Sequence, residues 1–551
     1  MIELSAAEIS EVVSGRLRGV EDPAGLRVTV ADTDSRQFGE GSSNGPGPGL
    51  FIAKPGETTD GHRFIDAALE AGAVLVLAQR VTDDATGSPH PAVIVDDVVE
   101  AMGLLAAEIV TRIRAHSPTT VIGITGSAGK TTTKDLLRQL LTPEGPTVAP
   151  QGSYNGEVGV PLTIFTAPLH TRFLIVEMGA DAPGNIRYLA QMVRPDIGVV
   201  LMVGSAHAGK FGGADKIAAV KGELAEAIAP DGAVILNDDD PQVRSMAARA
   251  VAPITWFGTS AGESSSAESA EASSRSGEGS SLGGEAGAQE ARRVTASEVA
   301  LDESGHPHFT LRVRQGAGDE EAPVRSGLTG THHVTNLLAA AAAARQLGVS
   351  TQEIARRLDG LGPGSRWRMQ RTERADGVTV INDAYNANPE SMREALRTLA
   401  MITRPTGRRS VAVLGPMLEL GAEAIPRHTQ LGETAVRLNI GKLVVVGDEA
   451  YSLYRGAIAE GSWGSEVHWV PDVEAAEAYL EDEIRPGDVV LLKSSNGAGL
   501  GHLGDAIAAK AAAAPGAPHT RETPEVTETT QMTTRQTSEA GADTAEKRGT
   551  Q

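Results

Sequence analysis

Short apolar runs alternate with longer amphipathic stretches along most of the chain, and this alternation predicts an α/β architecture. The first part holds β-like runs at 26–36, 49–56 and 73–80, then a helical stretch at 98–117 that ends before Pro118. A second series starts at 120–126 and continues with apolar runs at 173–179, 196–204 and 232–238. Continuous apolar runs between helices are typical of strands buried in a mainly parallel sheet.

A third α/β series starts near Gly362. Its expected strands are 378–385, 409–415, 442–448 and 488–495. Between the second and third series the pattern predicts a hairpin over 291–314 and a helix over 336–348.

Two segments lack such a pattern. Residues 260–290 are rich in Ser, Gly, Ala and Glu, and the end of the chain is rich in Thr, Glu and Ala. Neither composition can bury a core, so we expect disorder in both. The predicted division is therefore three α/β domains at 1–115, 116–362 (with the insertion at about 260–290) and 363–513, followed by a tail at 514–551.

Composition excludes several classes of protein. The 551 residues carry a formal net charge of −22, which argues against a general binder of nucleic acid or anionic membrane. Cysteine is absent, which excludes disulfides, thiolate metal sites and a cysteine nucleophile. The start MIELSAAEIS has no apolar region of a secretory signal, and no apolar run approaches the roughly 18 residues of a membrane span. We expect a cytoplasmic location.

Residues 122–133, IGITGSAGKTTT, have the form of a phosphate-binding loop between a strand and a helix. Gly126 and Gly129 allow backbone N–H groups to turn toward an anion, and the following helix N-terminus adds partial positive charge. Lys130 can reach the β- and γ-phosphates, and the Thr131 hydroxyl can bind Mg²⁺. Ile124 stands where the strict GxxxxGK[ST] pattern requires glycine, but the shorter TGxxGKT form is satisfied. The motif predicts ATP or GTP binding and leaves the reaction open.

Glu177 and His207 each follow an apolar strand, at the edge of the sheet where ligands bind in parallel folds. Glu177 is a candidate Mg²⁺ ligand, although a helix-capping or surface acid is the alternative. A lone histidine is usually structural, but its shared placement with Glu177 makes His207 a second candidate.

Lys221 lies on the apolar face of its predicted helix, between Ile217 and Leu224. Such a lysine either extends its amine to solvent or is functional. A buried amine has a lowered pKa, and a neutral amine can react with CO₂ to form a carbamate that holds a metal ion. The spacing alone favours the solvent-directed alternative.

Together these residues resemble the Mur ligase family, whose members are ATP-dependent amide-forming ligases of peptidoglycan precursor synthesis. The resemblance covers about residues 1–510 and is an ordered series of motifs: TGSAGKTTT, YNGEVGVPLT, VEMGA, VGSAH, AAVKGEL, GTHHVTNLLAAAAA, GSRWR and VINDAYNANPESM. It implies a UDP-substrate-binding first domain, a central P-loop ATPase-type domain with a parallel sheet, and a Rossmann-like third domain.

Within that family, NDAYNANPESM followed by VLGPMLELG resembles the members that add D-alanyl-D-alanine to UDP-N-acetylmuramoyl-tripeptide through an acyl phosphate. The alternatives are the ligase that adds the third, diamino acid, a related enzyme such as folylpolyglutamate synthetase, and a non-catalytic nucleotide-binding protein. The Asn-Pro-Arg element of the diamino-acid ligases is not evident. The resemblance implies ATP, two Mg²⁺ ions, a monomer and no nucleic-acid partner, and leaves lysine or diaminopimelate open in the tripeptide.

The resemblance also implies site residues. Phosphate would be bound by the loop residues Gly126, Ser127, Ala128, Gly129, Lys130, Thr131 and Thr132. Mg²⁺ would be bound by Thr131, Glu177, His207 and a carbamylated Lys221. Asn155, which follows the loop in the sequence, would also belong to the nucleotide site. Adenine and ribose would lie near His332, Asn336 and Asp383, and Arg366 would reach ATP phosphate from the third domain. Tyr385, Asn386 and Asn388 would line the ATP and dipeptide side, and Ser35, Arg36, Asp60, Gly61 and His62 would hold the uridine nucleotide.

Four positions depart from the family pattern. His333 stands where Asn is common, and Pro416 stands where an acidic residue is common. Ser494 and Asn496 stand where Gly and Arg are frequent. These departures concern the contacts with adenine and dipeptide, not the reaction.

Overall fold

The computed structural model describes residues 1–39, 47–56, 59–150, 152–204, 214–259, 292–315, 318–461 and 465–510. The predicted insertion at 260–290, the tail at 514–551 and His207 lie outside these ranges. Within the described residues, each helix is too short or too polar to cross a membrane.

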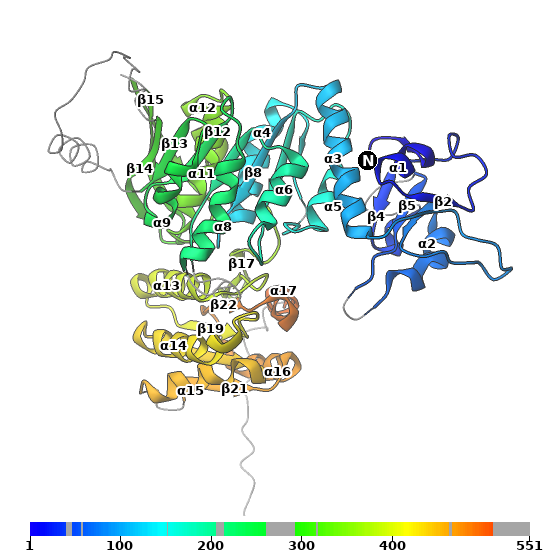
Figure 1. Cartoon of the computed structure of the whole chain (residues 1–551). Coiled ribbons are helices and arrows are strands. Elements are labelled where there is room, and N and C mark those ends of the chain that lie inside the picture. Colours follow the sequence, from blue (N-terminus) through cyan, green and yellow to red (C-terminus); the bar gives the residue numbers. More distant parts are fainter. Residues whose placement is uncertain are drawn as a thin grey trace, which may run out of the picture. The chain divides into compact units, whose positions relative to one another are not determined.

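The first domain is built on a small sheet with strand order β2-β7-β6-β5-β4 (Figure 1). The strands are Arg16–Arg18, Ala92–Ile94, Ala73–Ala78, Gly49–Ile52 and Val30–Asp32, and β4 to β7 are parallel. A pair of short strands, β1 (Leu4–Ser5) and β3 (Arg27–Val28), lies beside α1 (Ala6–Val12). α2 (Ile65–Ala71) packs against β5 and β6. The three predicted strands are confirmed, whereas β1, β2 and β7 were not predicted.

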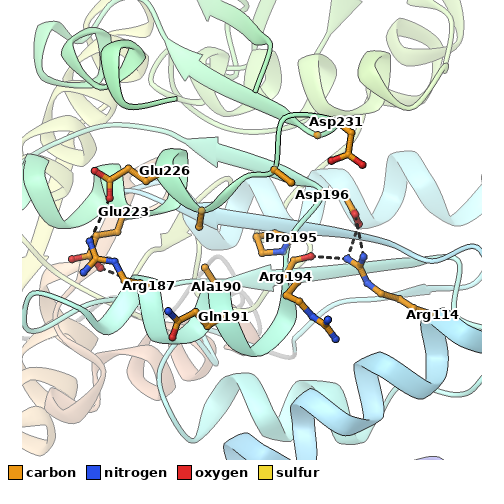
Figure 2. Close-up of a pocket in the computed structure, with 13 residues that line it drawn as sticks. Arg114, Arg187, Ala190, Gln191, Arg194, Pro195, Asp196, Glu223, Glu226 and Asp231 are labelled. Atoms are coloured by element: carbon orange, nitrogen blue, oxygen red, sulfur yellow. Dashed lines mark hydrogen bonds and ion pairs between the residues drawn. The ribbon is translucent and has the colours of Figure 1, made fainter. Parts of the chain in front are cut away.

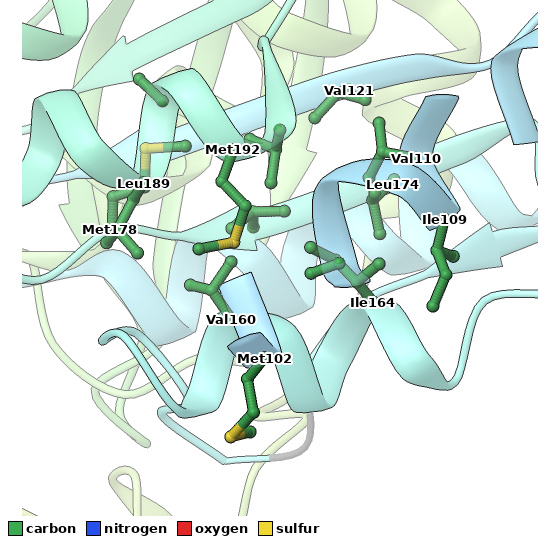
Figure 3. Packing of buried hydrophobic residues seen from close by; sticks show 14 of the residues in the cluster. Met102, Ile109, Val110, Val121, Val160, Ile164, Leu174, Met178, Leu189 and Met192 are labelled. Atoms are coloured by element: carbon green, nitrogen blue, oxygen red, sulfur yellow. The ribbon is translucent and has the colours of Figure 1, made fainter. Parts of the chain in front are cut away.

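The long predicted helix is α3, Val98–His116, and it ends at Ser117 as expected. Asp97 caps its N-terminus by accepting hydrogen bonds from the amides of Val99 and Glu100. Its apolar face packs against α5 (Gly159–Phe165) and α6 (Asn185–Val193), where Met102 and Ile109 lie among central-domain side chains (Figure 3). One hydrophobic core thus runs continuously across the predicted boundary between residues 115 and 116.

The central sheet has nine strands in the order β16-β15-β14-β13-β12-β11-β8-β10-β9 (Figure 1). From β9 to β14 all neighbours are parallel, and β14, β15 and β16 form an antiparallel edge. The hairpin prediction is confirmed by β14 and β15, and β16 is an additional strand. In chain order the strands are β8 Thr120–Thr125, β9 Thr147–Val148, β10 Phe173–Glu177, β11 Ile197–Val200, β12 Ala233–Asn237, β13 Ile254–Gly258, β14 Arg292–Leu301, β15 Pro307–Gln315 and β16 Gly318–Arg325.

Side chains that alternate along each central strand pack against different helices. Val121 and Leu174 face the core formed with α3, α5, α6 and α8 (Ala214–Ala227). Ile122 and Ile175 face the core formed with α4 (Lys130–Leu141), α11 (His333–Gln346) and α12 (Thr351–Leu358). Helices therefore cover both faces of the sheet, and the carboxyl edge of its parallel strands remains available for a ligand.

The third domain has the strand order β17-β18-β22-β19-β20-β21, parallel except for β17 (Figure 1). The four predicted strands are confirmed, whereas β17 and β21 were not predicted. The strands are Gln370–Glu373, Thr379–Asn382, Val489–Lys493, Ser410–Leu414, Lys442–Val446 and Val467–Val470, and α13 to α17 are Pro389–Thr406, Ala424–Arg437, Tyr451–Ala459, Val473–Glu483 and Leu500–Ala509. α13, α14 and α15 pack on one face of the sheet, and α16 and α17 pack on the other.

Candidate active site

The predicted phosphate loop connects β8 to α4 with the geometry that an anion site requires. Gly126 and Gly129 have φ values of +157° and +86°. A Cβ atom at Gly129 would lie 2.2 Å from Oδ1 of Asn336, so only glycine fits this close approach. No side chain caps the first turn of α4 among the described residues, which leaves its amides able to bind an anion.

Lys130 opens α4, and its Nζ donates to the carbonyl of Gly126 at 2.8 Å. Burial lowers the pKa of Lys130, while the negative charge of Glu177 acts in the opposite direction. The ammonium group is therefore enclosed beside the loop and held by a single backbone oxygen, a position from which it can turn to a phosphate.

Glu177, at the end of β10, is completely buried next to this loop. Its Oε2 accepts from the hydroxyls of Thr131 at 3.3 Å and Ser153 at 3.2 Å. Its Oε1 is buried and has no hydrogen-bond partner among the described residues. Burial raises the pKa of Glu177, and the Lys130 charge opposes this shift. A buried carboxylate oxygen without a partner is costly, and a bound cation would remove that cost.

Lys221 lies on α8 and lines the same cleft as the phosphate loop. Only 6% of the residue is exposed, so the amine does not extend to solvent, contrary to the alternative that the spacing favoured. Burial, and then the charge of Lys130, lower the pKa of Lys221 to about 7. The described residues offer its amine neither a hydrogen bond nor an ion pair. At neutral pH a large fraction of this amine is uncharged and nucleophilic.

Among the described residues, no three His, Asp or Glu side chains gather as a metal cluster. The oxygen atoms that do converge are the Thr131 hydroxyl and the Glu177 carboxylate, both of which suit Mg²⁺. His207, the other predicted ligand, lies outside the described residues.

Arg368 brings the third domain to the phosphate loop. Its Nη2 donates to Oγ1 of Thr131 at 3.2 Å, and its guanidinium lies 4.3 Å from the ring centroid of Tyr385. The Tyr385 hydroxyl accepts from the amide of Ser153 at 3.0 Å. Two contacts therefore join the third domain to the loops around Glu177.

Arg366, the arginine that we expected here, lies elsewhere. Its side chain is 71% exposed, pairs with Asp505 at 2.6 Å and does not line the cleft. The backbone of Trp367, at φ +58°, turns the chain between the two arginines, so they point to different surroundings. Motif matching did not separate Arg366 from Arg368 because both lie in GSRWR. The structure thus places Arg368, and not Arg366, beside the phosphate loop, and the role of either arginine at ATP phosphate stays a prediction.

Asp383 lines the cleft, but both of its carboxylate oxygens are engaged. Oδ1 accepts from the amide of Met369 at 3.0 Å, and Oδ2 accepts from Nζ of Lys493 at 2.6 Å. Lys493, which sequence reasoning missed, is buried and also donates to the carbonyl of Asn386 at 2.9 Å. It thereby fixes the loop that carries Tyr385. Its position directly after an apolar run was the available signal.

Asn336 and His332, at the start of α11, also line the cleft. The hydroxyl of Thr133 donates to Oδ1 of Asn336 at 3.5 Å, and Nδ2 of Asn336 lies 3.3 Å from Nδ1 of His333. His333 thus takes part in a hydrogen-bonded group behind the phosphate loop. Burial lowers the pKa of His332 and of His333 and so favours the uncharged form of both rings.

These residues surround one cleft of about 1060 Å³. Glu177 contacts Thr131 but does not itself line the cleft, and Asn388 both lines it and caps α13 through the amide of Ser391. Asn155 donates to Ser153 Oγ at 3.0 Å. The predicted residues that line the cleft are Gly126, Ser127, Ala128, Gly129, Lys130, Thr131, Thr132, Asn155, Lys221, His332, Asn336, Asp383, Tyr385, Asn386 and Asn388.

The five predicted uridine-site residues lie apart from this cleft, in the first domain. Asp60 accepts from Nδ1 of His62 at 2.6 Å and from Arg80 at 2.7 Å, and these bonds lower the pKa of its carboxyl. His62 is buried, and its Nε2 accepts from the amide of Gln79, so its ring supports the local backbone. Gly61 is required because a Cβ would lie 2.5 Å from the carbonyl oxygen of Lys54.

Ser35 and Arg36 lie in a short 3₁₀ turn, Ser35–Gln37, whose N-terminus is capped by Asp34. Arg36 is largely exposed and pairs with Asp34 at 2.8 Å. Both residues are therefore at the surface of the first domain, where a diphosphate could replace the carboxylate partner of the arginine.

A second concavity, of about 580 Å³, lies at the amino edge of the central sheet, opposite to the edge that carries the phosphate loop (Figure 2). Arg114 pairs there with Asp196, and Arg187 pairs with Glu226. Glu223 accepts from the amides of Gly184 and Arg187 and so holds the start of α6. These charged groups are paired with one another or with backbone amides, and we therefore assign them a structural role in the domain.

Comparison with known proteins gives a consistent family. Three family profiles match in order: the Mur ligase family catalytic domain at residues 39–116, the Mur ligase middle domain at 124–344, and the Mur ligase glutamate ligase domain at 367–496. The UDP-N-acetylmuramoyl-tripeptide–D-alanyl-D-alanine ligase of Mycobacterium tuberculosis is 43% identical over 542 residues, which cover 92% of this chain and 98% of that protein. The ligase of the same name from Bacillus subtilis is 29% identical and covers 90% of this chain and 96% of that protein.

Solved structures agree. A MurF from Acinetobacter baumannii superposes with a TM-score of 0.72 at 26% identity and covers 92% of this chain and 99% of that one. A MurF ligase from Thermotoga maritima, in complex with ADP, gives a TM-score of 0.65 at 26% identity and covers 87% and 97% of the two chains. The chain therefore belongs to the Mur ligase family, among the members named UDP-N-acetylmuramoyl-tripeptide–D-alanyl-D-alanine ligase.

Proposed function

We propose that this chain joins D-alanyl-D-alanine to UDP-N-acetylmuramoyl-tripeptide in an ATP-dependent reaction that gives the pentapeptide precursor of peptidoglycan. The relative at 43% identity that is named for this reaction supports the choice of substrates. The observation that carries the proposal is one cleft in which Lys130 and Thr131 of the phosphate loop face Arg368 and Tyr385 of the third domain. A phosphate and an acceptor can be held there side by side.

A carboxylate is a poor electrophile, so the tripeptide carboxylate must first be activated. One carboxylate oxygen would bond to the γ-phosphorus of ATP while the bond from that phosphorus to ADP breaks, giving an acyl phosphate. The amine of D-alanyl-D-alanine would then attack the carbonyl carbon, lose a proton, and expel phosphate. Two anions must approach each other in the first step, and Lys130 and Arg368 would offset their repulsion.

Magnesium would be held by the Thr131 hydroxyl and by Oε1 of Glu177, the buried oxygen that has no partner among the described residues. These hard oxygen donors fit the ion, and His207 and Lys221 are proposed as further ligands. When bound, the ion supplies positive charge beside the transferred phosphoryl group.

Lys221 is proposed to act as a carbamate. Its amine, with a pKa of about 7, would add to the carbon of CO₂, forming an N–C bond while one C=O pair moves to oxygen and a proton leaves the nitrogen. The product is an anion in place of a buried cation. That change of sign would suit a cleft in which Lys130 is already positive.

The remaining assignments are proposals of the same kind. His332, Asn336 and Asp383 would lie near adenine and ribose, and the first-domain residues Ser35, Arg36 and Asp60 to His62 would hold the uridine nucleotide. The contact of Asn336 with the glycine turn supports the first assignment. The cytoplasmic location and the monomeric state stay predictions.

The test is phosphate release by the purified full chain with ATP, Mg²⁺, UDP-N-acetylmuramoyl-tripeptide and D-alanyl-D-alanine, with each component omitted in turn. We expect release only when all are present, together with a pentapeptide product by mass spectrometry. Release with UDP-N-acetylmuramoyl-dipeptide and a diamino acid instead would move the reaction one step earlier. ATP binding without release in any combination would favour a regulatory protein.

A further inference from the structure

The segment that presents Arg368 has an unusual backbone. Trp367 and Met369, the residues on either side of it, have φ values of +58° and +50°. Non-glycine residues rarely adopt this left-handed region, and they persist there only when their surroundings fix them. Two such residues around one arginine indicate that its direction is held against a local conformational preference.

Trp367 is held by α17. Its indole Nε1 donates to Oδ2 of Asp505 at 3.0 Å, and its ring meets His502 edge to face at 4.8 Å. A Cβ at Gly501 would lie 2.5 Å from the indole, so the helix leaves room for the ring at this position. The amide of Trp367 also donates to Gln370 Oε1 at 3.2 Å. The side chain and the backbone of Trp367 are therefore both fixed.

Asp505 connects three parts of the third domain. Besides the indole, it accepts from Arg366 Nη2 at 2.6 Å and from Asn382 Nδ2 at 3.3 Å. The guanidinium of Arg366 lies 5.1 Å from the centroid of the Trp367 ring and covers it from outside. Arg366, which does not reach the phosphate loop, thus helps to hold the tryptophan that precedes Arg368.

Met369 is held on the other side of the arginine. Its amide donates to Asp383 Oδ1, its side chain is buried in the third-domain core, and Lys493 holds the other oxygen of Asp383. With both neighbours fixed, Arg368 contacts Thr131 and Tyr385. Its Nε is buried and has no hydrogen-bond partner among the described residues, so one donor is left for a ligand in the cleft.

From these contacts we propose that Asp505, acting through Trp367, is a positioning residue that fixes the direction of Arg368 toward the phosphate loop. The inference rests on the proposed function, in which Arg368 faces the transferred phosphate. Asp505 itself does not line the cleft, so we expect its effect on the reaction to pass through Trp367 and Arg368.

A double-mutant cycle tests this. The full chain is compared with Asp505→Ala, Arg368→Ala and the double variant, and kcat, KM for each substrate and Kd for ATP are measured. We expect Asp505→Ala to lower kcat by about tenfold, as for a displaced catalytic group, with KM for the UDP substrate unchanged. In the Arg368→Ala background the same substitution should have no further effect, because the residue through which it acts is gone.

Glu460→Gln is the matched control. Glu460 pairs with Arg437 on the same domain at 2.8 Å, and its side chain is 30% exposed, against 31% for Asp505. It should leave kcat and Kd for ATP at the wild-type values. Trp367→Phe keeps an aromatic ring but removes the pyrrole ring and with it the N–H donor to Asp505. It should reproduce the loss in kcat even if Asp505→Ala lowers the yield of folded protein.

Equal losses from Asp505→Ala with and without Arg368 would overturn the inference, because a general structural effect is additive. Failure of the proposed function is a different result: the wild-type chain would bind ATP and form no pentapeptide. In that case the cycle on Kd for ATP still decides the inference, because Arg368 and its support also act on the bound phosphates.

Discussion

The phosphate loop and the segment Arg366–Met369 each bring a cation to the cleft, Lys130 beside Gly126 and Arg368 beside Thr131, and both contain backbone with positive φ. In the loop the residues with positive φ are glycines, Gly126 and Gly129. In the segment they are Trp367 and Met369, each of which costs about 1–3 kcal/mol in that conformation. The loop needs little support beyond its own backbone, whereas the segment depends on distant contacts from α17 and Asp383.

This difference shows which parts of the structure fix the position of each cation. Lys130 extends from the first turn of a regular helix, so its position follows from β8 and α4 alone. Arg368 is set by side chains from several elements of the third domain, so its position follows from the tertiary structure.

The largest expected effect is at the loop itself. Lys130→Ala should lower kcat by about 10³-fold or more, because a preorganised charge beside the transferred phosphate is lost and nothing else replaces it. Steady-state phosphate release measures this, and a thermal melt checks that the fold is kept. Lys216→Ala, an exposed lysine on α8, is the control. A loss below about tenfold would show that Lys130 does not face the reacting phosphate.

The next effect separates the two arginines. Arg368→Ala should lower kcat/KM for ATP by about 10²- to 10³-fold, since it removes the third-domain charge near Thr131. Arg366→Ala should cost much less, because its guanidinium is exposed and contacts Asp505 and Trp367 but not the cleft. The same coupled phosphate assay compares both variants. If Arg366→Ala lowered kcat/KM more than Arg368→Ala, Arg366 would be the arginine that acts on ATP. The third domain would then have to rearrange before the reaction to bring it there.

The pair of arginines also shows what the sequence can and cannot predict. Thr131 and Glu177 were expected at one site because a glycine turn and a strand end place them locally. Lys221 was expected there only from the family resemblance, because its helix spacing favoured a solvent-directed amine. Nothing local distinguishes Arg366 from Arg368, because the choice depends on Trp367 packing against Gly501 of a helix more than a hundred residues later.

The same holds for the fold. Strands with continuous apolar runs, such as 410–414 and 489–493, were predicted because their burial on both faces is visible in the sequence. β16, with the sequence GDEEAPVR, was missed because it is an edge strand that pairs with β15 among the described strands, and half of its residues are charged. Tertiary pairing alone makes it a strand.

A smaller effect is expected from replacing a glycine of the phosphate loop. Gly129→Ala should weaken ATP binding by about 10- to 100-fold, because the new methyl group meets Asn336 Oδ1 at 2.2 Å in a backbone conformation that alanine avoids. Isothermal titration with ATP measures the change. Gly348→Ala, another positive-φ glycine but one with open space around its Cβ position, is the control for strain without the clash. Equal affinity in Gly129→Ala and wild type would mean that Asn336 can move away without cost.

The smallest expected effect concerns Lys221 and depends on pH. Its pKa is about 7 in the folded chain against an ordinary value of 10.5, so between these values the unfolded chain holds a proton that the folded chain lacks. This group's contribution to stability therefore rises with pH through that window, and below pH 7 the full cost of burying the charged amine remains. Carbamate formation needs the uncharged amine, so it weakens on the same acidic side.

We therefore expect removal of dissolved CO₂ to lower the initial rate by a few-fold at pH 8 and less at pH 6, where less of the amine is uncharged and less carbamate is present. Adding bicarbonate should restore the rate. A ¹³C carbamate signal that appears with labelled bicarbonate, and is absent from Lys221→Met, would assign the effect to this residue. If the initial rates at both pH values did not change when CO₂ was removed, Lys221 would act without a carbamate, as an amine. The central domain would then supply one anionic ligand fewer to a metal ion, and Glu177 would be the main carboxylate that binds it.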